Sequence, residues 1–375
     1  MIREVVSQRP DWQHRLEAAG MNWHRGPGEL CWNESAVYCL SEIEIQQIRS
    51  TAIEVYALYK QAAAHVVQYG LWGRLGFHEE DAPIIQASWE RQDRCLLSRF
   101  DFLLDEYNQP RLIEFNAETA LSLVESGPAQ KQWQNEVMPQ HPQFNELHER
   151  LVSAWRQYNQ PHIHCAWRPR HPETIGTLRY MSRVIAEAGF QTTLMAMQSI
   201  GWDPQARSFV DQHEVPIQCC YKIYPGEWML REPFARHLVN TSGTFIEPMW
   251  RLMFSSKGML ALLWELFPNH PALLPAYADT PASLTSFVRK PFFGREGGNI
   301  SIFENATLTH RQPGEPDDQM QVYQALLHSP RHDGRQAQLG VWMVGEEPAA
   351  LGIRESQGPM ITGDSPFVPH VIRHG

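Results

Sequence analysis

Lysine is scarce in this chain of 375 residues, since only five of its 32 basic residues are lysines. The six cysteines form no C-x-x-C pair, which argues against a zinc site or a disulfide framework and favours a reducing compartment. The longest apolar run, residues 258–267, is broken by Glu265 and is too short to span a bilayer. The charged N-terminus has no apolar segment of the signal-peptide type. We therefore expect a cytoplasmic protein with no membrane partner.

A basic footprint for nucleic acid is also missing, because the formal net charge is −10. This excess of acid is compatible with a cationic substrate, and equally with an ordinary acidic protein. The chain contains no G-x-G-x-x-G after a strand, no Walker A sequence and no H-E-x-x-H. No internal repeat is evident either. Dinucleotide-binding folds, P-loop enzymes and zinc proteases of these types are thus disfavoured.

Residues 98–127 contain the strongest local signal, because they predict two strands joined by a polar turn at 105–110. Side chains alternate along a strand, so the first strand shows Arg99 and Asp101 on one face and the second shows Glu114 and Asn116. If these faces coincide, oxygen ligands suited to Mg²⁺ converge beside a guanidinium that can grip an anion. The opposite faces would carry Phe100 and Phe102 with Ile113 and Phe115. An ordinary hairpin with one wet face remains the alternative.

Two of the rare lysines lie in other distinctive stretches. Lys257 falls in the first turn of a predicted helix, where its charge opposes the helix macrodipole unless an anion lies nearby. Lys290 ends a strand that leads into a glycine-rich loop, which predicts a flap whose backbone N–H groups approach phosphate. A glycine-rich hairpin turn is the alternative. The loop residues that we single out are Gly294, Arg295, Gly297, Gly298 and Asn299.

The remaining pattern predicts a mixed α/β fold. A capping box of Ser41 and Glu44 opens a long helix that Gly70 ends. We expect irregular chain over residues 1–40 and a surface loop over 363–370. Further expected elements are helices over 145–158, 172–188, 256–267 and 317–328, and strands over 162–167, 191–197, 218–223, 288–291, 300–302, 336–344 and 349–354.

Taken together, these motifs resemble the synthetase domain of glutathionylspermidine synthase. The matching residues occur in the family's order along nearly the whole chain: Arg99-Phe-Asp101, Glu114-Phe-Asn116, Lys257, Phe267-Pro-x-His270, Lys290-Pro-x-x-Gly-Arg295-x-Gly-x-Asn299 and Arg354. The resemblance implies an ATP-grasp-like fold with an interwoven pre-ATP-grasp α/β lobe. It also implies the organisation 1–97 (mainly helical), 98–127 (metal-binding hairpin), 145–205 (α/β lobe) and 215–375 (ATP-grasp lobes with the flap).

The same resemblance implies site roles and a reaction. Asp101, Glu114 and Asn116 would bind Mg²⁺, with two ions expected when nucleotide is bound. Lys257, Lys290 and the flap residues would bind the phosphates of ATP. Arg99 would hold the carboxylate or its acyl phosphate, and Arg354 would neutralise charge near the transferred phosphoryl group.

The expected activity is an ATP-dependent, ADP-forming ligase that joins a small acid to an amine. The resemblance suggests a peptide-like carboxylate and a polyamine, and it gives the chain no room for the amidase domain of bifunctional members. Leu121 stands where the family has small hydroxyl residues, so the acid stays open. The rival is a silent nucleotide-binding or scaffold protein on the same fold. A hydrolase is disfavoured, because no Ser-His-Asp or Cys-His set is evident.

Overall fold

A five-strand antiparallel path at the centre of the molecule carries the 98–127 hairpin. The computed structural model describes residues 1–24, 31–168, 172–295, 297–314, 319–363 and 365–373. The order along the central sheet is β19 (Phe367–Val368), β18 (Glu347–Ser356), β17 (Arg335–Val344), β3 (Leu97–Leu104) and β4 (Pro110–Asn116). A short strand, β16 (Arg331–His332), also pairs with β17. Because β3 pairs with β17, strands from opposite halves of the chain build one sheet.

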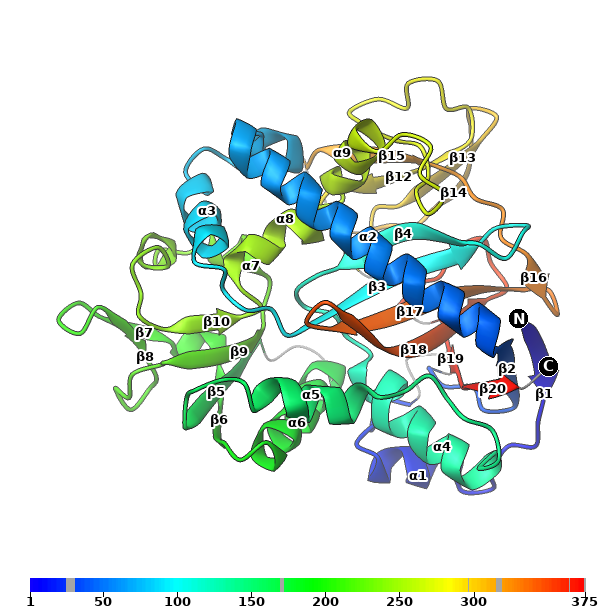
Figure 1. The fold of residues 1–375 in the computed structure, drawn as a ribbon, viewed down its shortest axis with the longest axis horizontal. Helices are drawn as coiled ribbons and strands as arrows, with labels where there is room; N and C mark the ends of the chain where they lie inside the picture. The colour runs from blue at the N-terminus through cyan, green and yellow to red at the C-terminus, as the bar shows by residue number, and fades with distance from the viewer. Residues whose placement is uncertain (25–30, 169–171, 296, 315–318, 364, 374–375) are drawn as a thin grey trace.

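Three further sheets surround this centre (Figure 1). A parallel sheet has the order β10 (Thr244–Ile246), β9 (Cys219–Ile223), β5 (His162–Trp167) and β6 (Gln191–Ala196). An antiparallel sheet has the order β11 (Ala276–Ala278), β15 (Gln321–Ala325), β12 (Phe287–Pro291), β13 (Ser301–Glu304) and β14 (Thr307–Arg311). The third has the order β1 (Ile2–Val5), β2 (Ala36–Ser41) and β20 (His370–Arg373), so it joins the two chain ends. A separate hairpin consists of β7 (Gly201–Asp203) and β8 (Ser208–Val210).

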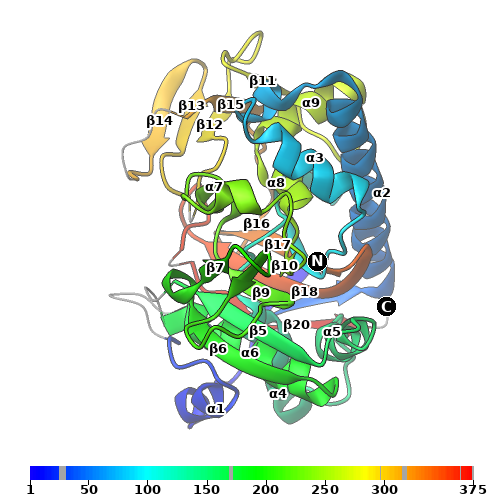
Figure 2. The same cartoon turned by 90° about the vertical axis from the view of Figure 1, so that its left-hand side faces the viewer.

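The helices cover the sheets, and the turned view shows α6 beside β5 and β6 (Figure 2). Their bounds are α1 (Trp12–Ala18), α2 (Glu42–Tyr69), α3 (Ala82–Glu90), α4 (Gln130–Val137), α5 (Leu147–Trp155), α6 (Pro172–Glu187), α7 (Gly226–Met229), α8 (Leu252–Ser255) and α9 (Gly258–Leu266). Within the described part of the chain, no helix is both long enough and apolar enough to cross a membrane.

The long helix α2 confirms the predicted boundaries and packs on the hairpin. The side chain of Ser41 accepts the N–H of Glu44 in a complete capping box, and Gly70 ends the helix with a left-handed φ of 64°. Edge-on contacts join Tyr59 to both Phe100 and Phe115. The last two rings stack with centroids 3.7 Å apart. This aromatic layer fixes the apolar face of the hairpin and leaves its polar face toward the site.

Three secondary-structure predictions are wrong. Residues 1–40 contain β1, α1 and β2, so they are not simply irregular. Residues 321–325, expected in a helix, form β15 because pairing with β11 and β12 outweighs local helix propensity; residues 317 and 318 of that expected helix lie outside the described part. The 363–370 segment is not a surface loop, since Phe367 and Val368 pair with β18 and His370 is buried. Each error involves a partner distant in sequence.

The predicted mixed α/β class is confirmed. The four-part organisation into 1–97, 98–127, 145–205 and 215–375 stays a prediction.

His370 is a neutral histidine sealed behind the central sheet. Its Nε2 accepts the N–H of Phe144 at 3.2 Å, which leaves Nδ1–H to donate to Oε1 of Gln130 at 3.1 Å. Burial lowers the pKa of His370 from 6.5 to about 3. Below pH 6.5, His370 is therefore protonated in the unfolded chain but stays neutral in the folded protein.

We predict that His370 destabilises the protein in acid. The stability that depends on a neutral His370 is fully present above pH 6.5. As the pH falls toward 3, the free energy of unfolding decreases by about 1.4 kcal/mol per pH unit. Between pH 7 and pH 5, the free energy of unfolding should consequently fall by about 2 kcal/mol less in His370→Gln than in the wild type. Urea unfolding at both pH values tests this, with the exposed His213→Gln as the control. Parallel pH dependence in wild type and His370→Gln would contradict it.

Candidate active site

The hairpin brings its four predicted polar residues together. Arg99 lies opposite Asn116 and Asp101 lies opposite Glu114 in the antiparallel register. Arg99 donates to both carboxylate oxygens of Asp101, at 2.6 and 2.9 Å. Nδ2 of Asn116 lies 3.1 Å from Oδ2 of Asp101 and 3.3 Å from Oε1 of Glu114. The polar faces of the two strands therefore coincide, as the alternation predicts.

A β-bulge between Asp101 and Phe102 changes the rest of the hairpin. Phe102 lies opposite Leu112, and both are fully buried. The expectation that Ile113 shares the apolar face with Phe115 is thus wrong, because the bulge shifts the alternation by one residue. The carbonyl of Ile113 instead accepts a hydrogen bond from Lys290 at 3.1 Å.

Both predicted lysines reach the hairpin. Nζ of Lys257 lies 3.2 Å from Oε2 of Glu114 and donates to the carbonyl of Gly294 at 2.8 Å. Nζ of Lys290 donates to Oε1 of Gln324 at 2.7 Å. Although burial opposes it, Lys257 and then Lys290 lower the pKa of Glu114 to about 2. Burial lowers the pKa of Lys290 to about 8, and an anion at this place would raise that pKa again.

The glycine-rich loop begins beside Lys257 and crosses toward α7. Arg295 donates to Oγ1 of Thr119 at 3.0 Å and forms an ion pair with Glu227. Gly297 and Asn299 adopt left-handed φ values of 75° and 59°. The loop therefore makes a tight turn over the chain that leaves β4. Gly294 and Gly298 also lie in this turn, and residue 296 lies outside the described part.

Arg354 lies on β18, two strands away from Arg99. It donates to the carbonyls of Ser365, Thr362 and Gly363. A cavity of about 10 Å³ is lined by Arg99, Asp101 and Arg354 together with Ser126, Gln338, Gly340, Gly352 and Phe367. Burial, and then Arg99, lower the pKa of Arg354. Two guanidinium groups thus face one cavity, which as it stands has room for about one water molecule.

The chain after β4 is held by buried polar contacts that the sequence did not suggest. Nζ of Lys222 lies 3.1 Å from Oε1 of Glu118, whose other oxygen accepts the N–H of Gly226 at 3.0 Å. Arg251 donates from Nε to the carbonyl of Ala117 at 3.0 Å, and its Nε lies 4.0 Å from the carboxylate of Glu247. These contacts position the stretch from 117 to 126 over the hairpin. The one sequence feature that could have pointed to these contacts is Lys222, because lysine is rare in this chain and this one lies in a strand.

Two carboxylates near the guanidinium pair were also missed. Glu125 lies in a π-helical turn, Glu125–Ala129, and accepts the indole N–H of Trp23 at 2.6 Å. Glu173, at the start of α6, accepts the N–H of Ser122 at 2.7 Å. No local sequence pattern connects these residues, because they come from three distant segments.

A cation site of three protein oxygens fits the hairpin. Among the described residues, no group of three His, Cys, Asp or Glu side chains could hold a metal ion, so a site here needs an amide as well as two carboxylates. Both carboxylates already lie within hydrogen-bond distance of the Asn116 amide. Turning that amide by 180° would present its oxygen beside them. Such a donor set suits Mg²⁺, which keeps several waters and substrate oxygens.

Comparisons with known proteins identify the family. A model described as "Glutathionylspermidine synthase preATP-grasp" matches residues 3–373. The chain belongs to this family. Membership makes it a ligase that forms a carbon–nitrogen bond. A glutathione synthetase-like effector from Globodera pallida has the same fold, with a TM-score of 0.56 over 98% of both chains at 11% identity. The predicted ATP-grasp-like fold is thereby confirmed.

Three relatives show how far the likeness extends. The chain is 33% identical, over 96% of its length and 97% of the other, to a Haemophilus influenzae protein named "Putative acid--amine ligase". It is 26% identical to the trypanothione synthetase of Crithidia fasciculata, covering 77% of this chain and 49% of that one. It is 24% identical to the bifunctional glutathionylspermidine synthetase/amidase of Escherichia coli, covering 89% and 59%. The chain thus spans about half the length of the trypanothione synthetase and 59% of the bifunctional protein.

We predict that Arg251→Met destabilises the protein by about 3 kcal/mol, since it leaves the buried Glu247 carboxylate without its counter-charge and the Ala117 carbonyl without its donor. Arg150→Met is the matched control, because the pair of Arg150 with Glu146 is solvent-exposed and should contribute less than about 1 kcal/mol. Urea unfolding midpoints compare the two. Equal losses would contradict a structural role for Arg251.

Proposed function

We propose that this protein is a cytoplasmic, ATP- and Mg²⁺-dependent acid–amine ligase that forms its amide through an acyl phosphate. The observation that carries the proposal is the convergence on one hairpin of two guanidiniums, two carboxylates, an amide, two lysines and a glycine-rich loop. A site that binds a triphosphate, its metal ion and a substrate carboxylate needs charges of both signs in a buried place.

The chemistry follows from the inertness of a carboxylate toward amines. Transfer of the γ-phosphoryl group to the carboxylate creates a good leaving group, and the amine then displaces phosphate. Phosphoryl transfer needs positioning and neutralisation of charge rather than a covalent nucleophile. Arg99 is proposed to bind the carboxylate, and Arg354 the charge that develops on the transferred group. Both would exchange their present partners, Asp101 and three carbonyls, for these anions.

Asp101, Glu114 and Asn116 are proposed to hold Mg²⁺, with two ions present when nucleotide is bound. Bound there, Mg²⁺ would neutralise phosphate oxygens and polarise them. Lys257 and Lys290 are proposed to contact the phosphates. Gly294, Arg295, Gly297, Gly298 and Asn299 are proposed to form a flap that offers backbone N–H groups to them.

The substrates are proposed by analogy with the named relatives. Glutathione and spermidine are the first acid and amine to test, because relatives carry those names. Leu121 accepts a hydrogen bond from Arg99 at its carbonyl, at 2.7 Å, and its side chain is only partly buried against the core, so it is proposed to shape the acid pocket. The net charge of −10 is compatible with a cationic amine.

We predict a Mg²⁺-dependent thermal shift with ATP that Asp101→Asn abolishes. A ligand at a hundredfold over its Kd adds about 2.7 kcal/mol to the folded state, and the variant loses a carboxylate that would bind the cation. Glu106→Gln is the matched control, because it lies exposed in the turn of the same hairpin. No shift in the wild type, or an equal shift in Asp101→Asn, would contradict the proposed site.

Release of ADP separates the ligase from a silent nucleotide-binding protein. A ligase should release ADP only when an acid and an amine are both present, and Lys290→Met should lower its affinity for ATP at least tenfold by removing a phosphate contact (about 1.4 kcal/mol). The assay couples ADP release to NADH oxidation over a panel of acids and amines led by glutathione and spermidine. Binding of ATP without turnover for every pair would favour the silent alternative.

A further inference from the structure

One carboxylate oxygen beside the guanidinium pair is buried and lacks a partner. Glu125 is 3% exposed, and its Oε1 accepts the indole N–H of Trp23 at 2.6 Å. Its Oε2 is buried with no hydrogen-bond partner among the described residues. A buried acceptor left unpaired is unfavourable, so such a group calls for a ligand or a catalytic role.

The surrounding contacts connect Glu125 to the reactive centre. Leu121 accepts a hydrogen bond from Arg99, and Ser122 donates to Glu173. The next residue after Glu125, Ser126, lines the cavity shared with Arg99 and Arg354. Its hydroxyl is also buried without a partner among the described residues. Residues 121–126 therefore connect the carboxylates of Glu125 and Glu173 to the guanidiniums of Arg99 and Arg354.

The proton affinity of Glu125 suits proton transfer near neutral pH. Burial, and then the negative charge of Glu173, raise its pKa to about 8 against the opposing effects of the Trp23 hydrogen bond and Arg354. Asp101 and Arg99 are the other charges across the cavity. A general base works best when its pKa lies near the operating pH. The turn itself is π-helical, a distortion that is frequent at functional sites.

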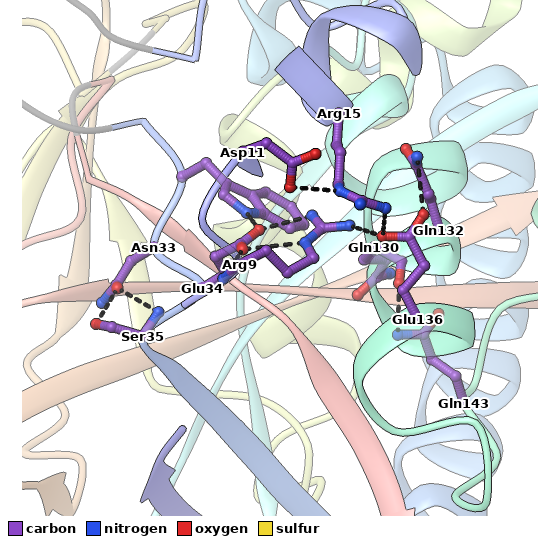
Figure 3. Close-up of polar contacts among 11 residues, drawn as sticks. Arg9, Asp11, Arg15, Asn33, Glu34, Ser35, Gln130, Gln132, Glu136 and Gln143 are labelled. Atoms are coloured by element: carbon purple, nitrogen blue, oxygen red, sulfur yellow. Dashed lines mark hydrogen bonds and ion pairs between the residues drawn. The ribbon is translucent and has the colours of Figure 1, made fainter. Parts of the chain in front are cut away.

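Trp23 lies in the N-terminal segment, which a partly buried ion network joins to α4. Arg9 lies between Glu34 and Glu136, at 2.7 and 2.6 Å, and Arg15 shares Glu136 (Figure 3). The indole ring lies against Gly176 of α6, where a Cβ would fall 2.0 Å from its Cζ3. Only glycine permits that approach. The packing on Gly176 and the hydrogen bond to Glu125 therefore hold the indole in place.

We propose that Glu125 is the general base that takes the proton from the attacking amine, and that Trp23 positions it. This inference rests on the proposed ligase function. The substrate ammonium gives a proton to the Glu125 carboxylate, which frees the lone pair on nitrogen. The nitrogen attacks the acyl carbon, the C–O bond to phosphate breaks, and its electron pair leaves with the phosphate. The second nitrogen-bound proton goes to the departing phosphate, and Glu125 returns its own proton to solvent.

Hydroxylamine tests this role, since it is neutral at pH 7 and needs no base to become a nucleophile. We expect Glu125→Gln, which keeps an oxygen for Trp23, to slow amide formation with spermidine by 10²- to 10⁴-fold. Hydroxamate formation with glutathione and hydroxylamine should stay within about threefold of wild type, because acyl phosphate formation does not use Glu125. Glu106→Gln should leave both rates unchanged. Other peptides and diamines replace this pair if the screen favours them.

Each contrary outcome has its own meaning. Equal losses of amide and hydroxamate would reduce Glu125 to a structural residue and overturn the proposal. An unchanged amide rate would also overturn it. No hydroxamate from the wild type with any acid would contradict the ligase function itself, and with it this inference.

A measurement without substrate tests the proton affinity directly. A carboxyl whose pKa is higher in the folded state than in the unfolded state makes the protein less stable as the pH rises from 4.5 to 8. Relative to wild type, the Tm of Glu125→Gln should therefore rise by roughly 3 °C between pH 6 and pH 8.5. If the difference in Tm between Glu125→Gln and the wild type were the same at both pH values, the raised pKa of Glu125 would be contradicted.

Trp23→Phe tests the positioning role, because it removes the indole donor and keeps a ring. Loss of that hydrogen bond should raise the pKa of Glu125, so the acid limb of the pH–kcat profile should move to higher pH while hydroxamate formation persists. A profile that keeps its shape, with lower rates throughout, would reduce Trp23 to a packing residue.

Discussion

The buried ion pair between Arg99 and Asp101 sets the conditions for the rest of the site. Taking two charges out of water costs several kcal/mol per ion, which only good geometry and further hydrogen bonds offset. The paired register of β3 and β4 supplies that geometry, and Asn116 and the Leu121 carbonyl supply the further bonds. Lys257 then balances Glu114 on the same face. The hairpin is stable without nucleotide because its charges neutralise one another.

The same constraint explains why the site draws on distant elements. Arg99 and Asp101 pair within the hairpin, whereas the other charged groups around them come from elements distant in the chain. Lys290 comes from β12, Arg354 from β18 and Lys257 from the turn before α9. Arg251 and the Lys222–Glu118 pair then hold the chain that leaves β4. A loss of packing at any of these elements would expose or unpair a charge at the centre, so the site and the fold share their stability.

Sequence reasoning succeeded where the signal was local. Alternation along two short strands predicted that Arg99, Asp101, Glu114 and Asn116 share a face, and one capping box with a glycine stop bounded α2. It failed where a remote partner decided the structure. The bulge at Asp101 exposes the Ile113 carbonyl to Lys290, which no alternation rule anticipates. Residues 321–325 have helix-forming neighbours, yet they form a strand that pairs with β11 on one side and with β12 on the other.

Glu125 and Trp23 illustrate the second kind of failure most clearly. Nothing in the 98–127 stretch distinguishes Glu125 from an exposed helix residue, and Trp23 lies among other tryptophans near the N-terminus. Their pairing involves the glycine at position 176 and the π-helical turn, two features that meet only after folding. A hairpin of hydrogen-bonded charges can bind and activate an acid, but an ammonium approaching it carries the same charge as Arg99 and Arg354. Glu173, and Glu125 once it has lost its proton, would offset that repulsion. In this proposal the N-terminal segment contributes to the reaction through the hydrogen bond from Trp23 to Glu125.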